Sequence, residues 1–420
     1  MRMGPMFHSP FADVSSWTSV TRRLALAGLI SAVMAPVLVN ACSLALFFGR
    51  HQFMNTRRRF VASASSPAGS ALALPGCSAQ MDTETYDMVA SRTWRPGPLT
   101  RLGGDALGRE LVRCASMAPS SHNTQCWKFA ITDKVITIIP DLTRRCPAVD
   151  PDDHHLFVSV GCAAENLIQG ALAHGFRGDA RFDSATDLVH VAMEQTPAQP
   201  SSLIKAIPER QCSRSDYDAK PLSNEELKLL QRAGTSDGVQ LLLITERIAM
   251  DQVLDQVVQA NTAQMADALF VKELMSWIRF NGAAAVRSGD GLYSKCTGNP
   301  SIPTWIGNLA FNWFFSTKSE NEKLVRQIRS SSGLAVFVGD ASDKAHWVNV
   351  GRCYQRFALQ ATALGIRNAF LNQPVEVISH RSNFAAAIGM PGQRPDLLVR
   401  FGRGPLMPRS LRRPVSAVLV

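Results

Sequence analysis

The stretch VSVGCAAENLIQGALAHGF at Val158–Phe176 has a counterpart later in the chain, VNVGRCYQRFALQATALGI at Val348–Ile366. Both stretches open with Val-x-Val-Gly and place a second glycine fourteen positions after the first, at Gly175 and Gly365. Helix-forming residues with apolar side chains at helical spacing fill the interval. Glycine fits the left-handed position that follows a helix C-terminus. The pattern therefore predicts two matching helices in one chain.

A second matched pair lies upstream of each helix. Ala118–Thr132 reads APSSHNTQCWKFAIT, and Ala233–Thr245 reads AGTSDGVQLLLIT. Each follows a short apolar helical run and leads into a strand. We therefore expect two units of the same plan, over residues 98–205 and 206–420. The period is too long for a solenoid, so duplication into a pseudo-dimer explains it better.

The two copies differ in their polar and basic residues. The first copy has a dense polar loop from Ser120 to Cys126, where the second has only Thr-Ser-Asp-Gly. The second copy carries arginines that the first lacks, in its entry segment ERQCSRSDYD (Glu209–Asp218) and its closing segment PRSLRRPVSAVLV. Loss of complementary halves is expected when a two-site dimer becomes a one-site monomer. The converse site would pair the short loop with the segment Trp94–Leu102, which lacks the Arg-x-x-Ser-Arg spacing.

Four segments resemble motifs of the nitroreductase family. APSSHNTQCWKF resembles its signature Pro-Ser-Ser-x-Asn-x-Gln-Pro-Trp, with Cys126 where proline is usual. ERQCSRSDY resembles the first phosphate-binding segment, and LNQPVEV at Leu371–Val377 resembles the loop that holds the central edge of the flavin. RFGRGPLMPRSLRRPVSAVL resembles the closing segment, whose arginine reaches the phosphate. The resemblance covers about residues 100–420, and the four motifs occur in the family's order.

This resemblance implies an α+β nitroreductase-like fold, with antiparallel or mixed sheets flanked by helices and two fused repeats that form a pseudo-dimer. It also implies one FMN between the repeats, with ring contacts from the first repeat and phosphate contacts from the second. The backbone N–H of Glu376 would face N5 of the flavin, and the ring itself would carry the redox chemistry. The cofactor ligands expected from the motifs are Ser120, Ser121, Asn123, Gln125, Arg210, Ser213, Arg214, Glu376, Arg412 and Arg413.

These residue types suit that ligand chemically. The planar fork of arginine binds phosphate oxygens through two parallel charge-assisted hydrogen bonds. Asn123 and Gln125 each offer a donor and an acceptor to the alternating edge of the ring. Two simpler interpretations stay open: an arginine pair near a C-terminus is typical of a solvated end, and Glu376 could equally be a surface charge.

The first eighty residues read as an export leader or membrane anchor. The pair Arg22–Arg23 precedes a largely apolar run, Leu24–Phe48, whose 25 residues are long enough to cross a bilayer. MNTRRRFVASASS, beginning at Met54, resembles a twin-arginine signal, and LPGC resembles a lipoprotein box ending at Cys77. We therefore expect a periplasmic or exported protein that uses the twin-arginine machinery. An anchor through residues 22–48 or a lipid at Cys77 are alternatives, as is a basic disordered tail.

Charge and cysteine spacing exclude other classes. The formal net charge is +10, but residues 1–80 hold seven arginines, no lysine and one aspartate, so the leader carries +6 of it. A nucleic-acid role would rest mostly on that leader. None of the nine cysteines forms a Cys-x-x-Cys pair, which favours buried free thiols over a zinc site or a disulfide framework. Asp152–Phe157, DDHHLF, is typical of a helix start rather than a metal site.

Two functions fit these features. The first is an FMN-dependent oxidoreductase that passes electrons to a small-molecule acceptor from a donor that the sequence does not identify. The second is a flavin-binding or storage protein with a sealed site. Leu254–Phe315, rich in Ala, Met, Phe and Trp, has no counterpart in the first copy. It is interpreted as a helical lid over the flavin, or else as an extension of the core.

Overall fold

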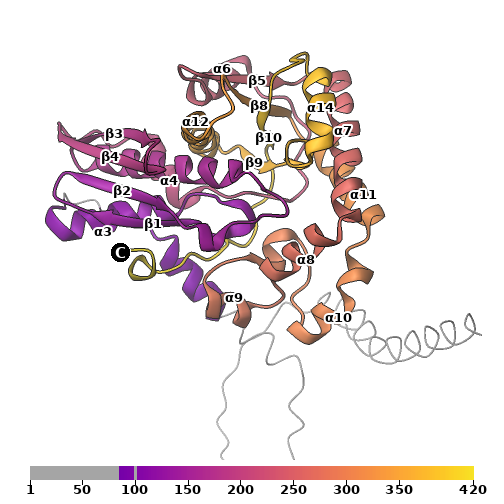
Figure 1. Cartoon of the computed structure of the whole chain (residues 1–420), viewed down its shortest axis with the longest axis horizontal. Helices are drawn as coiled ribbons and strands as arrows, with labels where there is room; N and C mark the ends of the chain where they lie inside the picture. Colours follow the sequence, from indigo (N-terminus) through magenta and orange to yellow (C-terminus); the bar gives the residue numbers. More distant parts are fainter. Residues whose placement is uncertain (1–84, 99–101) are drawn as a thin grey trace, which may run out of the picture. The chain divides into compact units, whose positions relative to one another are not determined.

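The computed structural model describes residues 85–98 and 102–420 (Figure 1). The expected export signal, anchor and lipidation site lie outside the described residues. A helix over residues 85–93 begins the described chain, and two four-stranded sheets follow.

Repeat one forms the first sheet. Its strands follow the order β1-β2-β4-β3, and every neighbouring pair is antiparallel. The predicted strand after the polar loop is present as β1. The elements of this repeat are α3 (Gly104–Ser116), β1 (Trp127–Ile131), β2 (Val135–Pro140), α4 (His154–Ala173), β3 (Phe176–Asp183), β4 (Leu188–Gln195) and α5 (Ser202–Ala206).

Repeat two forms the second sheet, in the order β5-β8-β10-β9, and its pairs are again all antiparallel. Its main elements are α6 (Asn224–Gly234), β5 (Val239–Ile244), β8 (Gly333–Gly339), α12 (Lys344–Ala363), β9 (Arg367–Phe370) and β10 (Pro395–Gly402). Taken in chain order, the four strands of each repeat occupy the same places in their sheets. The predicted α+β fold with two fused repeats is therefore confirmed.

The two long helices α4 and α12 pack against each other between the sheets (Figure 1). A Cβ atom at Gly161 would overlap the carbonyl oxygen of Val348, and one at Gly351 would overlap that of Val158. Each glycine of the Val-x-Val-Gly motif thus meets the first valine of the other copy. Such reciprocal contacts are what an isologous two-fold interface produces.

The polar contacts between these helices are also crosswise. The Arg356 guanidinium donates to Glu165 Oε2 at 2.9 Å, and Gln355 Nε2 donates to Asn166 Oδ1 at 2.6 Å. The closing glycines have φ values of 86° at Gly175 and 70° at Gly365, so both predicted left-handed positions are confirmed.

One hydrophobic core joins the two repeats. It contains residues of α3, α4, α12 and both sheets, including Trp127, Phe337 and Phe357, all with 0% exposure. Among the described residues, His154–Ala173 is the one helix that is long and apolar enough to cross a membrane, and 83% of its apolar window is buried inside the protein. That burial is typical of a core helix.

The repeats differ most between their first two strands. In repeat one a three-residue turn joins β1 to β2, whereas residues 245–332 separate β5 from β8. We call residues 245–332 the insertion; it extends beyond the expected Leu254–Phe315 at both ends. Its elements are α7 (Arg247–Ala266), α8 (Ala268–Trp277), β6 (Ile278–Arg279), α9 (Gly282–Ser288), β7 (Leu292–Tyr293), α10 (Thr304–Phe314) and α11 (Thr317–Arg329).

The C-terminal segment crosses from repeat two to repeat one. Phe129 of β1 donates its N–H to the carbonyl of Val418 at 2.7 Å and accepts from the N–H of Val420 at 3.0 Å. In Figure 1 the C-terminus accordingly lies beside β1 and α3. This path carries the basic closing segment of repeat two to the polar loop of repeat one.

Candidate functional site

A cavity of about 440 Å³ lies where the two repeats, the insertion and the C-terminal segment meet. This volume is within the usual range of ligand pockets, about 300–1,000 Å³. Seven of the ten expected ligand residues line it: Ser120, Ser121, Asn123, Arg210, Arg214, Glu376 and Arg412. Gln125, Ser213 and Arg413 do not line it, and their contacts show why.

Gln125 and Arg413 are hydrogen-bonded to each other. Gln125 Oε1 accepts from the backbone N–H of Arg413 at 2.7 Å, and its Nε2 donates to the carbonyl of Gly289 at 2.9 Å. The Arg413 guanidinium donates to the carbonyls of Gln125 and Trp127 at 2.6 and 3.1 Å. The prediction that these side chains contact a cofactor is therefore wrong, because their polar atoms join the loop to the C-terminal segment and the insertion.

Asn123 lines the cavity, but its amide is also occupied. Its Nδ2 donates to the carbonyls of Gly291 and Leu411 at 3.0 and 3.2 Å, and its Oδ1 accepts from Arg412 at 2.8 Å. Many of the polar groups of this loop therefore hydrogen-bond to other segments, and the Asn123 amide positions Arg412. The loop has φ values of 49° at His122, 55° at Asn123 and 54° at Gln125, a conformation uncommon outside glycine.

Arg210 and Arg412 form a buried cationic pair at one end of the cavity. They are 2% and 9% exposed. The Arg210 guanidinium makes one hydrogen bond, to the carbonyl of Met117 at 3.0 Å, and its Nε and Nη1 have no partner among the described residues. Burial, and then the Arg210 charge, lower the pKa of Arg412 to about 9.

No carboxylate in the described chain forms an ion pair with either arginine. The Arg412 guanidinium instead donates to uncharged groups, including the carbonyl of Ala118 at 3.1 Å, and its Nε is unpartnered. Two adjacent buried cations without a counter-charge are unfavourable unless an anion lies between them. This end of the cavity therefore fits an anionic ligand with several acceptor oxygens.

Further cations surround this pair. Arg214 lines the cavity, and burial together with the Arg214 charge lowers the pKa of His122 to about 4. Lys323, on α11, also lines the cavity, and its pKa is lowered by burial and then by the charges of Arg214 and other arginines. Lys323 is not evident from the sequence, because the insertion has no copy in repeat one with which to compare it.

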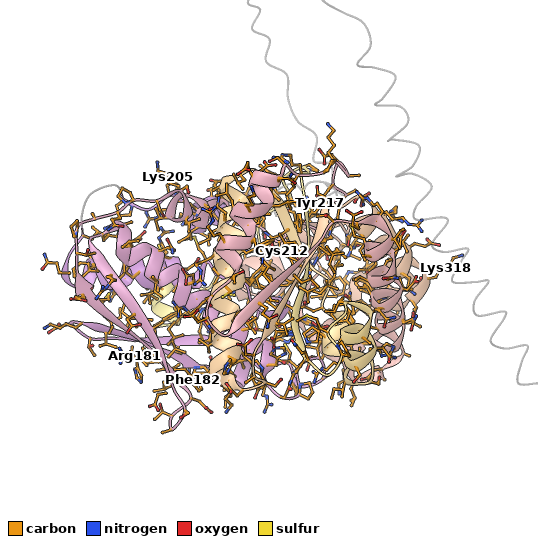
Figure 2. The ribbon with its side chains drawn as sticks, turned by 90° about the horizontal axis from the view of Figure 1, so that it is seen from above. Arg181, Phe182, Lys205, Cys212, Tyr217 and Lys318 are labelled. Atoms are coloured by element: carbon orange, nitrogen blue, oxygen red, sulfur yellow. The ribbon has the colours of Figure 1, made fainter. Side chains whose placement is uncertain are left out.

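Ser213 supports the backbone rather than the cavity. Its side chain is fully buried, its hydroxyl has no partner among the described residues, and its carbonyl accepts from Tyr217 Oη at 2.8 Å and from Arg400 at 3.1 Å. The Arg400 guanidinium lies over the Tyr217 ring, 4.0 Å from its centre. Figure 2 labels Cys212 and Tyr217 in the middle of the molecule, whereas Arg181 lies toward one end.

The N-terminal described segment also contributes to the cationic end. The Trp94 ring lies 4.9 Å from the Arg412 guanidinium and 5.6 Å from that of Arg409. Trp94 Nε1 donates to the carbonyl of Ser410 at 2.8 Å, and Tyr86 Oη donates to that of Arg409 at 2.5 Å. Trp94, from the segment that the incomplete converse site would have used, therefore lines this cavity.

A second part of the cavity lining combines apolar rings with a small polar group. Phe311 and Phe315 stack with centroids 4.7 Å apart and planes 11° apart, and both line the cavity. Other apolar residues of the insertion complete this wall: Met265, Phe270, Leu274, Ile278 and Phe280. A ligand with a flat apolar part and an anionic group therefore matches the residues that line the cavity.

Glu376 is the last residue of α13 (Gln373–Glu376) and is one of the polar residues in this part of the cavity lining. Its backbone N–H donates to the carbonyl of Asn372 at 2.8 Å, so the expected free N–H is engaged within the helix. Its carboxylate lines the cavity, accepts from Gln264 Nε2 at 2.7 Å, and has a pKa raised by burial. Interpreting it as a surface charge is therefore wrong.

The start of α4 is capped, although not by the expected residues. Asp150 accepts from the backbone N–H groups of His155 and Leu156 at 3.0 and 2.9 Å, whereas the side chain of Asp153 caps nothing. His155 enters the cavity wall as a result. Within the described ranges no cluster of three metal-ligating side chains occurs, and the seven described cysteines are free thiols.

Several known proteins are similar to this chain in sequence. No family model matches the chain. The Mycobacterium tuberculosis protein Rv3131, named as an NAD(P)H nitroreductase, is 25% identical over 323 residues, which cover 74% of this chain and 90% of that protein. The M. tuberculosis protein acg, also named as an NAD(P)H nitroreductase, is 23% identical over 321 residues, covering 74% and 94%.

Solved structures were also compared. A nitroreductase with bound FMN from Desulfitobacterium hafniense has a TM-score of 0.33 at 16% identity, covering 51% of this chain and 95% of that one. The FMN-dependent nitroreductase NfnB from Mycobacterium smegmatis, in complex with NADPH, has a TM-score of 0.33 at 12% identity, covering 48% and 87%.

The sequence relatives extend over both repeats and nearly their own full lengths, and the four motifs occur in the family's order on segments that the fold brings to one cavity. This chain is therefore similar to nitroreductases over about three quarters of its length.

Proposed function

We propose that the chain binds one FMN in this cavity and acts as an FMN-dependent oxidoreductase of the nitroreductase type. The proposal rests on Arg210 and Arg412, which are both buried and have guanidinium nitrogens without a partner among the described residues. A phosphomonoester carries about −1.5 to −2 charges at pH 7 and three acceptor oxygens. It supplies the counter-charge and the acceptors that these guanidiniums lack.

The remaining assignments follow from position. Arg214 and Lys323 would add positive charge on the phosphate side, and Trp94 would hold the arginines in place from behind. Ser121, whose hydroxyl has no side-chain hydrogen bond within the described chain, would contact the ligand from the polar loop. The stacked Phe311 and Phe315 would border the flat part of the ligand.

When bound, FMN supplies hydride transfer, while the protein positions the partners and sets the surrounding electrostatics. The basic residues favour negative charge on the ligand side of the cavity. The apolar side chains of the insertion exclude water from the part of the cavity that they line. The donor would be a reduced nicotinamide or another two-electron carrier, and the acceptor a small molecule that enters beside the apolar wall.

A flavin-storage role is the second candidate, and one observation favours it. The insertion supplies about half of the residues that line the cavity, so the ligand would be largely covered. Stopped-flow mixing of the flavin-loaded protein with NADH or NADPH separates the two functions. Bleaching of the flavin absorbance within seconds, followed by reoxidation by a quinone or a nitroaromatic, supports the oxidoreductase; a flavin that neither donor reduces supports storage.

The cofactor assignment is tested by titrating flavin-free protein with FMN. Arg210→Ala removes a charge-assisted contact worth roughly 2–4 kcal/mol, and should weaken binding by about 30- to 1000-fold. The matched control is Arg181→Ala, since Arg181 is an exposed residue of β3 that pairs with Asp179. Equal FMN affinity in the two variants would refute the assignment.

Export is a separate proposal that rests on the leader sequence. Changing Arg57 and Arg58 together to lysine should retain the protein in the cytoplasm, as measured by fractionation of cells that express the full chain. If export continues after both this change and replacement of Arg22 and Arg23, the proposal fails.

A further inference from the structure

We propose that His155 and Glu376 form a proton-donating pair that protonates the reduced acceptor in this cavity. The inference rests on the proposed oxidoreductase function and adds to it a source for the proton that must accompany each hydride. The two residues come from different repeats, since His155 is the second residue of α4 and Glu376 ends α13. Both side chains line the cavity.

Hydrogen bonding fixes the orientation of the imidazole. His155 Nε2 lies 3.1 Å from the backbone carbonyl oxygen of Asp396, which can only accept, so Nε2 carries a hydrogen. The other ring nitrogen, Nδ1, is buried and has no hydrogen-bond partner among the described residues. In the neutral ring Nδ1 therefore carries a basic lone pair, while Nε2 is held by the carbonyl oxygen of Asp396.

The group that faces Nδ1 is Glu376. Its Oε1 lies 3.8 Å from Nδ1, while its Oε2 is held by Gln264 of the insertion. This separation is just beyond a direct hydrogen bond and suits a single bridging water or a small side-chain movement. One proton can thus be shared between the imidazole and the carboxylate of two residues that line the cavity.

The surroundings favour retention of that proton. Burial raises the pKa of Glu376, and Asp150 raises it further, while His155, Gln264 and Arg381 act in the opposite direction. Behind the pair, His154 Nε2 and Asp396 Oδ1 lie 2.8 Å apart and engage each other. Arg381 and Arg394 are balanced by Asp152 at 3.8 and 2.7 Å.

The proton step balances simply. FMN bound as proposed above would supply the hydride, and the acceptor would then hold an extra electron pair on an oxygen or nitrogen atom. The N–H bond at His155 Nδ1, or the O–H bond of Glu376, then breaks while a new bond to hydrogen forms on the acceptor. The electrons of the broken bond stay on His155 or Glu376, and that residue then regains a proton from water.

The substitutions that test the pair are Glu376→Gln and His155→Asn, both close in size to the original residue. His174→Asn is the matched control, because His174 lies at the other end of α4 and outside the cavity lining. Binding of FMN is measured first, and failure of every protein to bind it counts against the proposed function. We expect both variants to keep FMN affinity within about threefold of the parent.

Stopped-flow reoxidation of the reduced protein by a benzoquinone then gives the chemical readout. General acid catalysis contributes about 10²- to 10⁴-fold, so each variant should be slower by that factor. The parent rate should fall as pH rises through the raised pKa of Glu376, because the acid must be protonated, and this dependence should disappear in Glu376→Gln. An unchanged rate and pH profile in both variants would overturn the proposal.

Nitrogen-15 spectra of the histidine rings provide a readout that does not depend on turnover. In flavin-free protein Nε2 of His155 should carry a hydrogen, and Glu376→Gln should shift the Nδ1 signal while His174→Asn should not. A His155 Nδ1 signal that is the same with and without the Glu376 carboxylate would also overturn the pairing.

Discussion

Two loops at the same place in the two repeats have different structures. Between α3 and β1 the first loop runs over ten residues, 117–126, whereas between α6 and β5 the second has four, 235–238. The first contacts the insertion and the C-terminal segment through Asn123 and Gln125. The second closes on its own repeat, where Asn349 Nδ2 of α12 donates to the carbonyl of Asp237 at 2.9 Å.

This difference supports the proposal that one site was kept and the other lost. The fold preserves its two-fold plan in the sheets and in the α4–α12 contact, so the scaffold alone does not decide where a ligand binds. A complete cavity occurs where a long loop of one repeat meets basic segments supplied by the other. A four-residue turn cannot provide those contacts, whatever its composition.

The largest expected effect is on the two-fold contact that both halves share. Gly161→Ala and Gly351→Ala should each lower the free energy of unfolding by about 3 kcal/mol or more, since the new Cβ overlaps a backbone oxygen that cannot move independently. Gly103→Ala is the control, because its Cβ would meet no atom within 4 Å. Urea unfolding measures all three, and a clear loss in only one of the two motif glycines would break the comparison.

Removal of one loop contact should distinguish the two loops. Gln125→Ala leaves buried polar groups of Arg413 and Gly289 without partners, and should cost about 1–3 kcal/mol of stability. Ser236→Ala in the short loop removes hydroxyl contacts with Cys353 Sγ and the carbonyl of Asp237, and should cost less than about 1 kcal/mol. Thermal unfolding of the two variants compares them directly, and similar losses would argue against a special docking role for the long loop.

Trp94→Ala should have a smaller effect on the ligand than loss of an arginine. A cation–π contact is worth roughly 0.5–2 kcal/mol, so FMN affinity should fall by about 3- to 30-fold. The matched control is Trp305→Ala, because that tryptophan is 69% exposed on α10. Isothermal titration would show equal affinities if Trp94 does not position Arg412.

The smallest expected effect is a pH dependence that only the long loop carries. Burial and Arg214 lower the pKa of His122 to about 4 in the folded chain, below the ordinary value of 6.5. The unfolded chain therefore binds the proton more readily, and flavin-free protein should lose stability as pH falls from 6.5 through 4. His122→Asn should lose less over that interval in thermal unfolding, and an equal loss would contradict the assignment.

Internal repetition made the fold predictable from sequence. Matching Val-x-Val-Gly helices and glycines at Gly175 and Gly365 report local geometry that each copy specifies for itself. The basic residues Arg210, Arg214 and Arg412 could be found for a similar reason, since the spacing of charges in a motif is a local property. Their convergence on one cavity follows from the crossing of the C-terminal segment.

The errors at the site come from contacts between distant segments. Gln125 and Arg413 have the chemistry of ligand contacts, but they satisfy each other across 288 positions of sequence. His155 and Lys323 line the cavity because a helix start and an insertion are placed there by tertiary packing. No local pattern in the sequence distinguishes a side chain that binds a ligand from one that binds another segment.

The central claim is that one chain contains one complete site built from both repeats. Flavin released by heat from the purified protein, divided by protein from amino-acid analysis, gives the stoichiometry, and light scattering gives the mass of the flavin-bound species. We predict one FMN per chain, bound to a monomer. A ratio near two, or flavin found only in a dimer, would contradict the account.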